Sequence, residues 1–314
     1  MASKTKLYLG EINSLVSSLS YLLDNEAAIL EQAAAFKSER SLTYRGGRAL
    51  LKAALLKDGL IGAGALIPTL SYNELGKPKM ALDPYSFNLS HSHQLMALAL
   101  GSHAMGVDVE LCDTRRLRPA LLKRVLSAQE LQYFHALDNV TNTDSRGYSQ
   151  SELMDKAVHS AQAAFFARQW TVRECLVKVM GKSIFTMDSI KLDLERCHIE
   201  AHDYPQGIIA CFAIELRDLG IGNDKINHTT HSLCLISPST AEDIGRGSTF
   251  GLANHFSFQI AVFLQFAYAK QQSLEQAVAE HLEIWMHQPQ AASTGLNADF
   301  KSVKVTPQVV FTIN

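Results

Sequence analysis

The sequence lacks the paired cysteines that disulfide-stapled domains and many zinc sites need. Its five cysteines are scattered and form no C-x-x-C pair, and its twelve histidines show no H-E-x-x-H spacing. Such close spacings are the usual signatures of disulfide frameworks and of zinc ligation. The pattern therefore favours free thiols in a reducing, cytoplasmic setting, and it disfavours zinc.

Long apolar runs and an excess of one charge are also absent. The most apolar stretches, residues 60–70 and 256–269, are interrupted by glycine and proline or by glutamine, and both fall short of the roughly 20 apolar residues that a membrane span needs. The first residues carry charge without an apolar run behind them, so we expect no secretory signal. The formal net charge of −2 is not typical of proteins that bind nucleic acids or membrane surfaces through a basic excess.

The sequence does contain enough apolar material for a sizeable core. Hydrophobic residues make up 47% of the 314 residues, which is within the range of globular proteins. This length suits one large domain or two small ones. We expect an N-terminal unit at residues 1–111, a second unit at residues 112–270, and a C-terminal helix and tail of unknown role at residues 271–314.

Hydrophobic periodicity indicates helices and strands in both units. We expect helices at residues 12–36, 44–56, 119–137, 161–180 and 273–287. We expect strands at residues 87–90, 96–100, 106–111, 191–194, 208–216, 256–266 and, in the tail, 303–313. The polar residues 138–160 predict an insertion with at most one short helix, and residues 218–251 predict a loop holding at most a strand at 232–236.

Two carboxylates close a short predicted strand, in the run G-V-D-V-E at residues 106–110. Residues i and i+2 of a strand face the same side, so Asp108 and Glu110 project together. Neighbouring carboxylates repel, and each raises the pKa of the other unless a cation lies between them. A solvated strand face is the alternative, because D-x-E is a common sequence.

Glu174 and Lys178 lie one helical turn apart in the helix expected at residues 161–180. The same spacing occurs in solvent-exposed ion pairs worth roughly 0.2–0.5 kcal/mol, and that alternative stays open. Trp170 lies on the same face, four residues before Glu174, and apolar residues at 166, 176, 177, 179 and 180 place much of the helix against a core. A glutamate that borders a buried tryptophan favours a functional site.

Three acids and a lysine from two distant segments suggest a divalent metal with an anionic substrate. Mg²⁺ prefers hard oxygen ligands and completes its shell with water or phosphate oxygens. Asp108, Glu110 and Glu174 are therefore its candidate ligands, with Mn²⁺ as an alternative ion. Lys178 would neutralise charge on a transferring or departing phosphate.

One histidine and several basic residues are candidates for holding that anion. The run F-N-L-S-H-S places His91 just after a short strand, where it could donate to a phosphate. Basic residues from separated segments could converge on a polyanion; they are Lys37, Arg40, Arg45, Arg48, Lys77 and Lys79. An ordinary loop histidine and a solvated helix face are the alternatives.

Several of these runs occur in the order and approximate spacing found in the 4′-phosphopantetheinyl transferase superfamily. They are G-K-P-K (76–79), F-N-L-S-H-S (87–92), G-V-D-V-E (106–110) and W-T-V-R-E-C-L-V-K (170–178). A further run, K-R-V-L-S-A-Q-E (123–130), is similar to the segment between the two acidic motifs of that family. The chain resembles the long, monomeric type that activates surfactin synthetase, over about residues 40 to 185.

The resemblance implies a reaction and its participants. Coenzyme A would donate its 4′-phosphopantetheine arm to a serine of an apo acyl or peptidyl carrier protein, with release of adenosine 3′,5′-bisphosphate. The enzyme would be of the holo-[acyl-carrier-protein] synthase type, dependent on Mg²⁺, monomeric and cytoplasmic. The carrier could serve fatty-acid, polyketide, polyunsaturated-lipid or nonribosomal-peptide synthesis.

The resemblance also implies roles for individual residues. Asp108, Glu110 and Glu174 would hold Mg²⁺ together with the pyrophosphate of coenzyme A. Glu174 is also a candidate base for the carrier serine, Glu130 is a second candidate base, and Lys178 would assist departure of the bisphosphate. Phosphates of coenzyme A would be bound by Lys77, Ser90, His91 and Arg48. Arg173 stands where many members have lysine, which keeps the charge.

The implied fold is α+β, with two similar α/β-type halves related by a pseudo-twofold axis and the active site at their interface. That division agrees with the boundary near residue 111 and with acids drawn from both halves. Two other functions stay open. One is a metal-dependent nuclease or phosphodiesterase, which the near-neutral charge opposes. The other is a pseudoenzyme that binds coenzyme A or the carrier without turnover.

Overall fold

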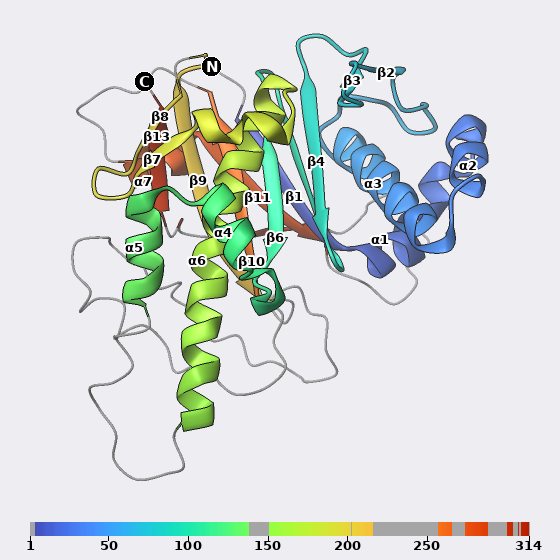
Figure 1. Cartoon of the computed structure of the whole chain (residues 1–314). Coiled ribbons are helices and arrows are strands. Elements are labelled where there is room, and N and C mark those ends of the chain that lie inside the picture. The colour runs from blue at the N-terminus through green and yellow to red at the C-terminus, as the bar shows by residue number, and fades with distance from the viewer. Residues whose placement is uncertain are drawn as a thin grey trace.

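The computed structural model describes most of the chain (Figure 1). The described residues are 4–137, 151–201, 203–215, 257–265, 274–287, 300–303, 307 and 309–313. Cys234 and the loop expected at residues 218–251 lie outside them, as does the first part of the insertion. Among the described residues, no helix is long and apolar enough to cross a bilayer.

The first sheet combines strands from both ends of the chain. Its five strands lie in the order β12 (Phe300–Val303), β11 (Leu282–His287), β1 (Thr5–Glu11), β5 (Leu95–Gly101) and β4 (Ser86–Ser92). β1 runs parallel to β11 and antiparallel to β5. β5 (L-M-A-L-A-L-G) is buried at every residue, which explains its continuous apolar sequence: both faces of this strand are covered.

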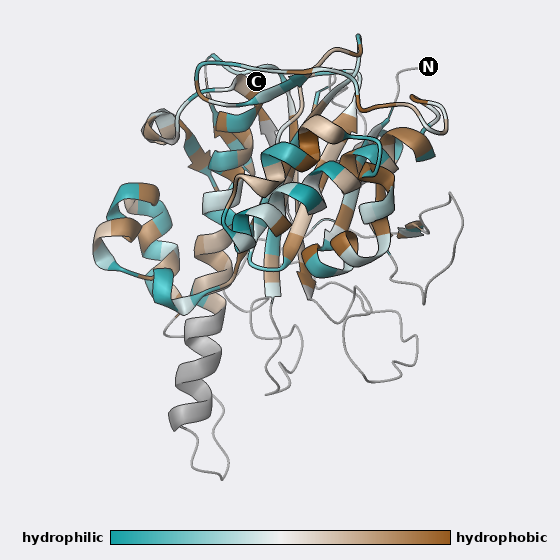
Figure 2. Ribbon diagram, turned by 90° about the vertical axis from the view of Figure 1, so that its right-hand side faces the viewer, coloured by the Kyte–Doolittle hydropathy of each residue, from teal (hydrophilic) through white to brown (hydrophobic). Residues whose placement is uncertain are grey.

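Two helices, α1 (Ile12–Leu19) and α3 (Ser38–Lys57), cover one face of the first sheet (Figure 1). The 3₁₀ helix η1 (Ser20–Leu23) and α2 (Ala27–Ala34) pack on α3. A small hairpin follows, made of β2 (Leu70–Tyr72) and β3 (Pro78–Met80). The turn expected around residues 73–78 joins these two strands. In Figure 2 the helices carry both hydrophilic and hydrophobic residues, as amphipathic helices on a sheet do.

The second sheet has six strands, in the order β6 (Val107–Leu111), β10 (Ser257–Leu264), β9 (Gly207–Glu215), β13 (Val309–Ile313), β8 (His198–Glu200) and β7 (Lys191–Asp193). The helical elements of this half are η2 (Thr114–Arg116), α4 (Pro119–Val125), α5 (Ala128–Ala136), α6 (Ser151–Met180), η4 (Ile184–Ser189) and α7 (Leu274–His281). Long α6 packs on β6 and β10. It thereby runs past the edge strand that carries the two acids.

Strand alternation divides the core into three apolar clusters. Leu7 and Leu9 of β1 point to a cluster shared with the second sheet, whereas Tyr8 between them points to α1 and α3. The third cluster fills the space between the second sheet and the helices α4 to α6. The layers therefore run helices, sheet, sheet, helices, and the α+β class predicted from the sequence is confirmed. The pseudo-twofold relation and the division at residue 111 stay predictions.

Three local expectations were wrong. Residues 151–160, expected within a polar insertion, form the first turns of α6. Residues 282–287, expected as the end of a helix, form strand β11 because they pair with β1. His91, expected just beyond a strand end, lies inside β4.

Candidate functional site

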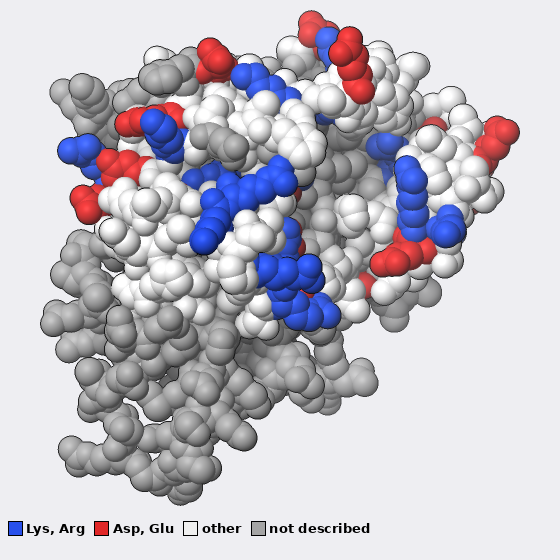
Figure 3. All heavy atoms as spheres, in the orientation of Figure 1, with Lys and Arg blue, Asp and Glu red and all other residues white. Residues whose placement is uncertain are grey.

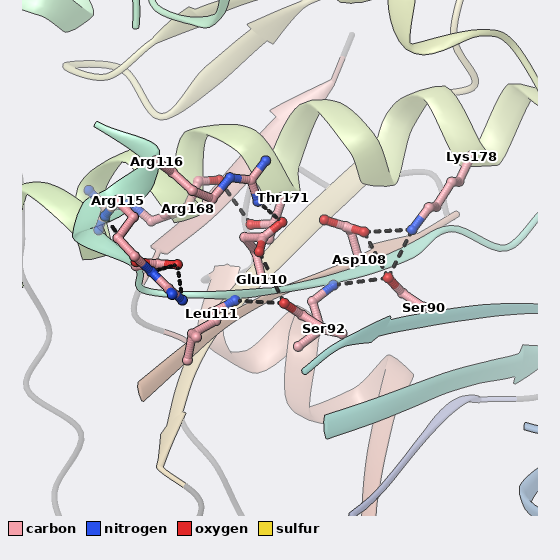
Figure 4. Close-up of polar contacts among 12 residues, drawn as sticks. Ser90, Ser92, Asp108, Glu110, Leu111, Arg115, Arg116, Arg168, Thr171 and Lys178 are labelled. Atoms are coloured by element: carbon pink, nitrogen blue, oxygen red, sulfur yellow. Dashed lines mark hydrogen bonds and ion pairs between the residues drawn. The ribbon is translucent and has the colours of Figure 1, made fainter. Parts of the chain in front are cut away.

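The two acids of β6 lie at the edge of the second sheet, beside β4 of the first sheet. Their neighbours Val107 and Val109 enter the core between the sheets, so both carboxylates face the opposite side. Asp108 is 5% exposed. Burial raises the pKa of the Asp108 carboxyl, and the Glu110 charge raises it further, while Lys178 and Ser90 act in the other direction. Figure 4 shows the acids and their contacts.

Helix α6 brings Lys178 onto the Asp108 carboxylate. Lys178 Nζ lies 2.5 Å from Asp108 Oδ1 and 2.9 Å from Ser90 Oγ (Figure 4). The close approach depends on a glycine: a Cβ at Gly106 would lie 2.4 Å from the carbonyl oxygen of Cys175 on α6. Gly106 therefore allows α6 to pack closely against β6, and Asp108 on that strand binds Lys178 of α6.

Glu174 lies one turn before Lys178 and is partly exposed. Burial raises the pKa of its carboxyl, and the charges of Asp108 and Glu110 raise it further. Within the described part of the chain, its carboxylate makes no hydrogen bond or ion pair. Three carboxylates thus influence one another electrostatically, and Glu174 keeps its oxygens available.

Arg116 was not among the residues predicted from the sequence. Its guanidinium pairs with Glu110 and lies over the Trp170 ring, with Cζ 4.6 Å from the ring centroid. It therefore links the acidic strand to the aromatic residue of α6. Only one signal was available in the sequence: a pair of arginines a few residues after D-V-E, which by itself indicates no more than a charged loop.

Glu130 lies apart from the acidic cluster. It is fully buried, and its carboxylate accepts two hydrogen bonds from Arg173, with nitrogen–oxygen distances of 2.9 Å and 2.7 Å. It also closes the capping box of α5 by accepting from the Ser127 backbone N–H at 2.8 Å. These bonds join α5 to α6. Arg173, which stands where many members of the family have lysine, makes a bidentate contact that lysine cannot make.

Lys77 also binds to protein atoms. Its ammonium donates to backbone carbonyl oxygens at the end of α6, those of Lys178 and of Val179, the latter at 3.1 Å. Burial lowers the pKa of this ammonium. A cation at a helix C-terminus is favourable because the last carbonyl groups are unpaired and the dipole is negative there. Lys77 thus fastens the β2–β3 hairpin to α6.

The other two predicted phosphate ligands differ in surroundings. His91 is exposed on β4. Its pKa is lowered by partial burial and by the charge of Lys178, while the charges of Asp108 and Glu110 raise it. The imidazole therefore interacts electrostatically with the acidic cluster. Arg48 is buried on α3; it donates to Tyr72 at 2.9 Å and lies over the Tyr44 ring at 4.9 Å.

The donor set suits a hard divalent ion such as Mg²⁺. Asp108 and Glu110 share one strand face, and Asp108 Oδ2 is buried without a hydrogen-bond partner in the described structure. Over the described ranges, no three His, Cys, Asp or Glu residues converge into a ready ion cage. Lys178 and Arg116 neutralise the two strand acids instead, so an ion would displace these cations. The carboxylates are suitable ligands for the ion. Lys178 and Arg116 now neutralise the negative charge that the ion would neutralise when bound.

The surface beside this cluster is hollowed. In Figure 3 a hollow separates the side of α4 to α6 from the helices α2 and α3, and Lys and Arg side chains lie on both sides of it. A recess bordered by cations from both halves favours an anionic ligand.

The four cysteines of the described residues (Cys112, Cys175, Cys197 and Cys211) are free thiols.

Comparison with known proteins points to one family. Residues 104–216 match the family model of the 4′-phosphopantetheinyl transferase superfamily. The chain is 28% identical to the 4′-phosphopantetheinyl transferase gsp of Aneurinibacillus migulanus over 113 residues, covering 36% of this chain and 38% of that protein. It is 28% identical to the 4′-phosphopantetheinyl transferase AcpT of Salmonella typhi over 203 residues, covering 62% and 87% of the two chains.

A third relative is the 4′-phosphopantetheinyl transferase of Bacillus subtilis, 26% identical over 180 residues, with 56% of this chain and 68% of that protein covered. The matched residues 104–216 contain the acidic strand β6 and the described part of α6 that approaches it. The resemblance predicted from the sequence motifs is confirmed: residues 104–216 of this chain are similar to the 4′-phosphopantetheinyl transferase superfamily.

Proposed function

We propose that this protein transfers the 4′-phosphopantetheine arm of coenzyme A to a serine of an acyl or peptidyl carrier protein. The observation that carries the proposal is the meeting of two distant segments, in which Lys178 of α6 lies 2.5 Å from Asp108 of β6. Glu174 stands on the same helical face and Glu110 on the same strand face. A lysine in contact with one acid, with two further acids on the neighbouring strand and helix positions, suits transfer of a phosphate-linked group.

The reaction forms one bond and breaks one. The carrier serine oxygen bonds to the phosphorus that bears the pantetheine arm, and the bond from that phosphorus to the bridging oxygen breaks, releasing adenosine 3′,5′-bisphosphate. Glu174 accepts the serine proton. The raised pKa of its carboxyl suits this role, because a base works best when its pKa lies near the working pH.

Lys178 would stabilise the departing phosphate. The Lys178 side chain is 25% exposed, and its ammonium pairs with Asp108. Developing negative charge on the leaving oxygen would draw Lys178 away from Asp108. We therefore propose that Lys178 stabilises the transition state more than it contributes to the binding of coenzyme A.

Asp108, Glu110 and Glu174 would hold Mg²⁺, or Mn²⁺ in its place. Such an ion, once bound, would balance charge on the pyrophosphate and polarise the phosphorus. The chain itself holds the carboxylates on β6 and α6. Before an ion binds, Lys178 neutralises Asp108 and Arg116 neutralises Glu110.

Among the predicted phosphate ligands, His91, Ser90 and Arg48 keep that proposed role. His91 is exposed beside the acidic cluster, Ser90 adjoins Asp108, and Arg48 is a buried cation on α3. Lys77 receives a different proposed role, because its ammonium is already bonded to backbone carbonyl oxygens at the end of α6. We propose that Lys77 acts as a fastening residue for α6.

The wider setting follows from the same site. One chain supplies both the acids of β6 and the lysine of α6, so we propose that a monomer suffices, as in the long type of the superfamily. Two halves with the site between them, a cytoplasmic location and holo-[acyl-carrier-protein] synthase activity belong to this proposal. Carrier proteins of fatty-acid, polyketide or nonribosomal-peptide synthesis are the proposed partners.

The test is to incubate the protein with coenzyme A, MgCl₂ and a panel of apo-carrier proteins, and to weigh the carriers by mass spectrometry. The expected result is a mass gain of one phosphopantetheine arm on at least one carrier, lost when its acceptor serine is changed to alanine. No gain on any carrier, with coenzyme A bound, would favour a binding protein without turnover. Cleavage of added DNA or RNA would favour a nuclease.

A further inference from the structure

Arg168 is a cation on the side of α6 that packs on the second sheet. Val172 and Cys175, one and two helical turns further along the same side, belong to the apolar cluster between this helix and the sheet. The Arg168 side chain is half-buried, and its Nε is buried without a hydrogen-bond partner in the part of the chain that the structure describes. Because arginine is rarely buried unless it is paired, this guanidinium requires a counter-charge or an acceptor.

No carboxylate supplies that counter-charge among the described residues. Burial lowers the pKa of the Arg168 guanidinium, and the groups that act against burial are thiols and not acids, those of Cys211, Cys197 and Cys112. Arg173 of the same helix, by contrast, pairs with a buried glutamate at 2.7 Å. The charge of Arg173 is therefore neutralised inside the protein, whereas that of Arg168 is not.

The strands β6, β10 and β9 form the surface beneath Arg168. Cys112, directly after β6, and Cys211 of β9 both face α6, because the residues next to them in the chain point into the core between the two sheets. Arg168 interacts electrostatically with both thiols, and β10 lies between their strands. The guanidinium therefore lies over β10, at the part of that strand where Gln259 faces α6.

Gln259 also lacks a partner at this place. It is 3% exposed, and Ile260 beside it points into the core between the sheets, so its amide projects toward α6. Its Oε1 is buried without a hydrogen-bond partner within the described ranges. A half-turn of the amide exchanges this oxygen for the NH2 group, so Gln259 can also offer donors. The Cys112 thiol interacts with both Gln259 and Ser257.

Together these groups suit a small anion. A guanidinium attracts negative charge and donates several hydrogen bonds in one plane, and amide, hydroxyl and thiol groups add donors. A cation would meet the charge of Arg168 with no described carboxylate to hold it. A water molecule would satisfy the hydrogen bonds, but it would leave the charge unbalanced. The close packing of helix on sheet limits the ligand to a few atoms.

We propose that Arg168, with Gln259 facing it, binds a small inorganic anion, chloride or phosphate, between α6 and the second sheet. The site is separate from the candidate active site, because Glu110 and Glu174 are not among the groups that act on the Arg168 guanidinium. The proposal goes beyond the proposed function and does not depend on it. A bound anion would join α6 to β10 and so stabilise the folded protein.

The first experiment measures the chloride nuclear magnetic resonance linewidth of a sodium chloride solution that contains the full chain. Chloride that exchanges with a protein site broadens the line. Arg168→Met, which keeps the length of the side chain without its charge, is expected to lose most of the added linewidth, and Arg168→Lys to retain part of it. Arg124→Met is the matched control, because Arg124 is exposed on α4 and its loss should leave the linewidth nearly unchanged.

Added sodium phosphate identifies the preferred anion. If phosphate binds more tightly, it narrows the chloride line of the unchanged protein; if chloride binds more tightly, the line stays broad at an equal phosphate concentration. Coenzyme A separates this site from the hollow, whose cations also attract chloride. Broadening that persists with coenzyme A present and requires Arg168 belongs to the proposed site.

Thermal unfolding at constant ionic strength gives an independent measurement, with sodium gluconate as the reference salt. An anion that binds only the folded protein should raise the melting temperature by about 2–4 °C for each tenfold increase above its dissociation constant. The unchanged protein and Arg124→Met should show this rise in sodium chloride or phosphate, and Arg168→Met should not. Arg168→Gln serves as a second uncharged variant if Arg168→Met does not fold.

Two results would overturn the proposal. One is an equal anion dependence in Arg168→Met and in the unchanged protein. The other is the absence of any anion-dependent broadening or stabilisation in the unchanged protein, which would mean that water alone solvates Arg168. A protein that shows the Arg168-dependent effects but modifies no carrier would contradict the proposed function and leave the anion site standing.

Discussion

At the scale of the residue, the site is a set of charges balanced before any ligand arrives. Asp108 is buried, and Lys178 and Ser90 share one of its oxygens. Even so, the pKa of its carboxyl is raised, chiefly by burial. A buried acid held at some cost to stability is typical of functional sites.

The free-energy cost of burying the ionised Asp108 carboxylate predicts how Asp108→Asn will change stability. Because the folded-state pKa lies above the unfolded one, the free energy of unfolding falls as pH rises through that interval, and the deficit persists at pH 7. Asparagine cannot ionise, so the variant should be at least as stable as the unchanged protein at pH 7, with the difference shrinking toward about pH 4. Urea unfolding at both pH values measures this. A marked loss of stability at pH 7 would mean that the ion pair with Lys178 outweighs burial.

Lys178 gives a second prediction at this scale. If its ammonium acts on the departing phosphate, Lys178→Ala should lower kcat by about 10²–10³-fold, the usual loss when one group stabilising transition-state charge is removed. The affinity for coenzyme A should change much less. Lys182→Ala, a nearby lysine whose ion pair with Asp203 is exposed, serves as the matched control. Equal losses in kcat and in affinity would assign Lys178 to binding.

At the scale of the element, the approach of α6 to β6 decides whether the acids and the lysine meet. Gly106 permits that approach, since an added Cβ would lie 2.4 Å from Cys175 O and 2.5 Å from Val179 Cγ2. The obstacle is partly backbone, which cannot turn aside as a long side chain can. The helix would have to shift, and Glu174 and Lys178 would shift with it.

Gly106→Ala should therefore destabilise the protein by about 1–3 kcal/mol or more, as overpacking does, and should weaken divalent-ion binding as well. Gly46→Ala on α3 is the control, because its added Cβ would meet neighbours at an ordinary 3.5 Å and alanine favours a helix by about 1 kcal/mol. Thermal unfolding of both variants is the measurement. An unchanged melting temperature in Gly106→Ala would contradict the close packing.

The elements near the site were well predicted because their signals are local. D-x-E predicted a strand with two acids on one face, and the apolar pattern predicted α6 from residue 161. The partners of these residues could not be predicted. Glu130 and Arg173 are 43 residues apart in the sequence, and the pairing of Arg116 with Glu110 depends on how the loop after β6 turns back. No periodicity of the sequence indicates either pairing. The hydroxyl of Ser90 could be placed only once β4 and β6 were seen side by side.

At the scale of the whole molecule, the C-terminal segments are built into both sheets. β11 lies between β12 and β1 in the first sheet, and β13 lies between β9 and β8 in the second. Ile284 and Met286 alternate toward the core between the sheets, so residues 282–287 carry a strand pattern. The sequence analysis extended the preceding helix over them because the pairing partner, β1, lies near the other end of the chain.

A chain ending at residue 270 should therefore fail to fold cooperatively. It would lose an inner strand from each sheet and expose the apolar faces of β1 and β9. Circular dichroism during heating is the measurement, with the full chain as control. A cooperative transition near the melting temperature of the full chain would show that the C-terminal strands are an addition to a core that is already complete.

The central claim is that the acids of β6 and the lysine of α6 act together on a phosphopantetheine arm with the help of a divalent ion. The most direct test is the rate of carrier modification against Mg²⁺ concentration, for the unchanged protein and for folded Asp108→Asn. The account predicts a rate that rises with Mg²⁺ and is lost on chelation in the unchanged protein, and no Mg²⁺-dependent rate in the variant. Modification by Asp108→Asn at the unchanged rate would contradict it.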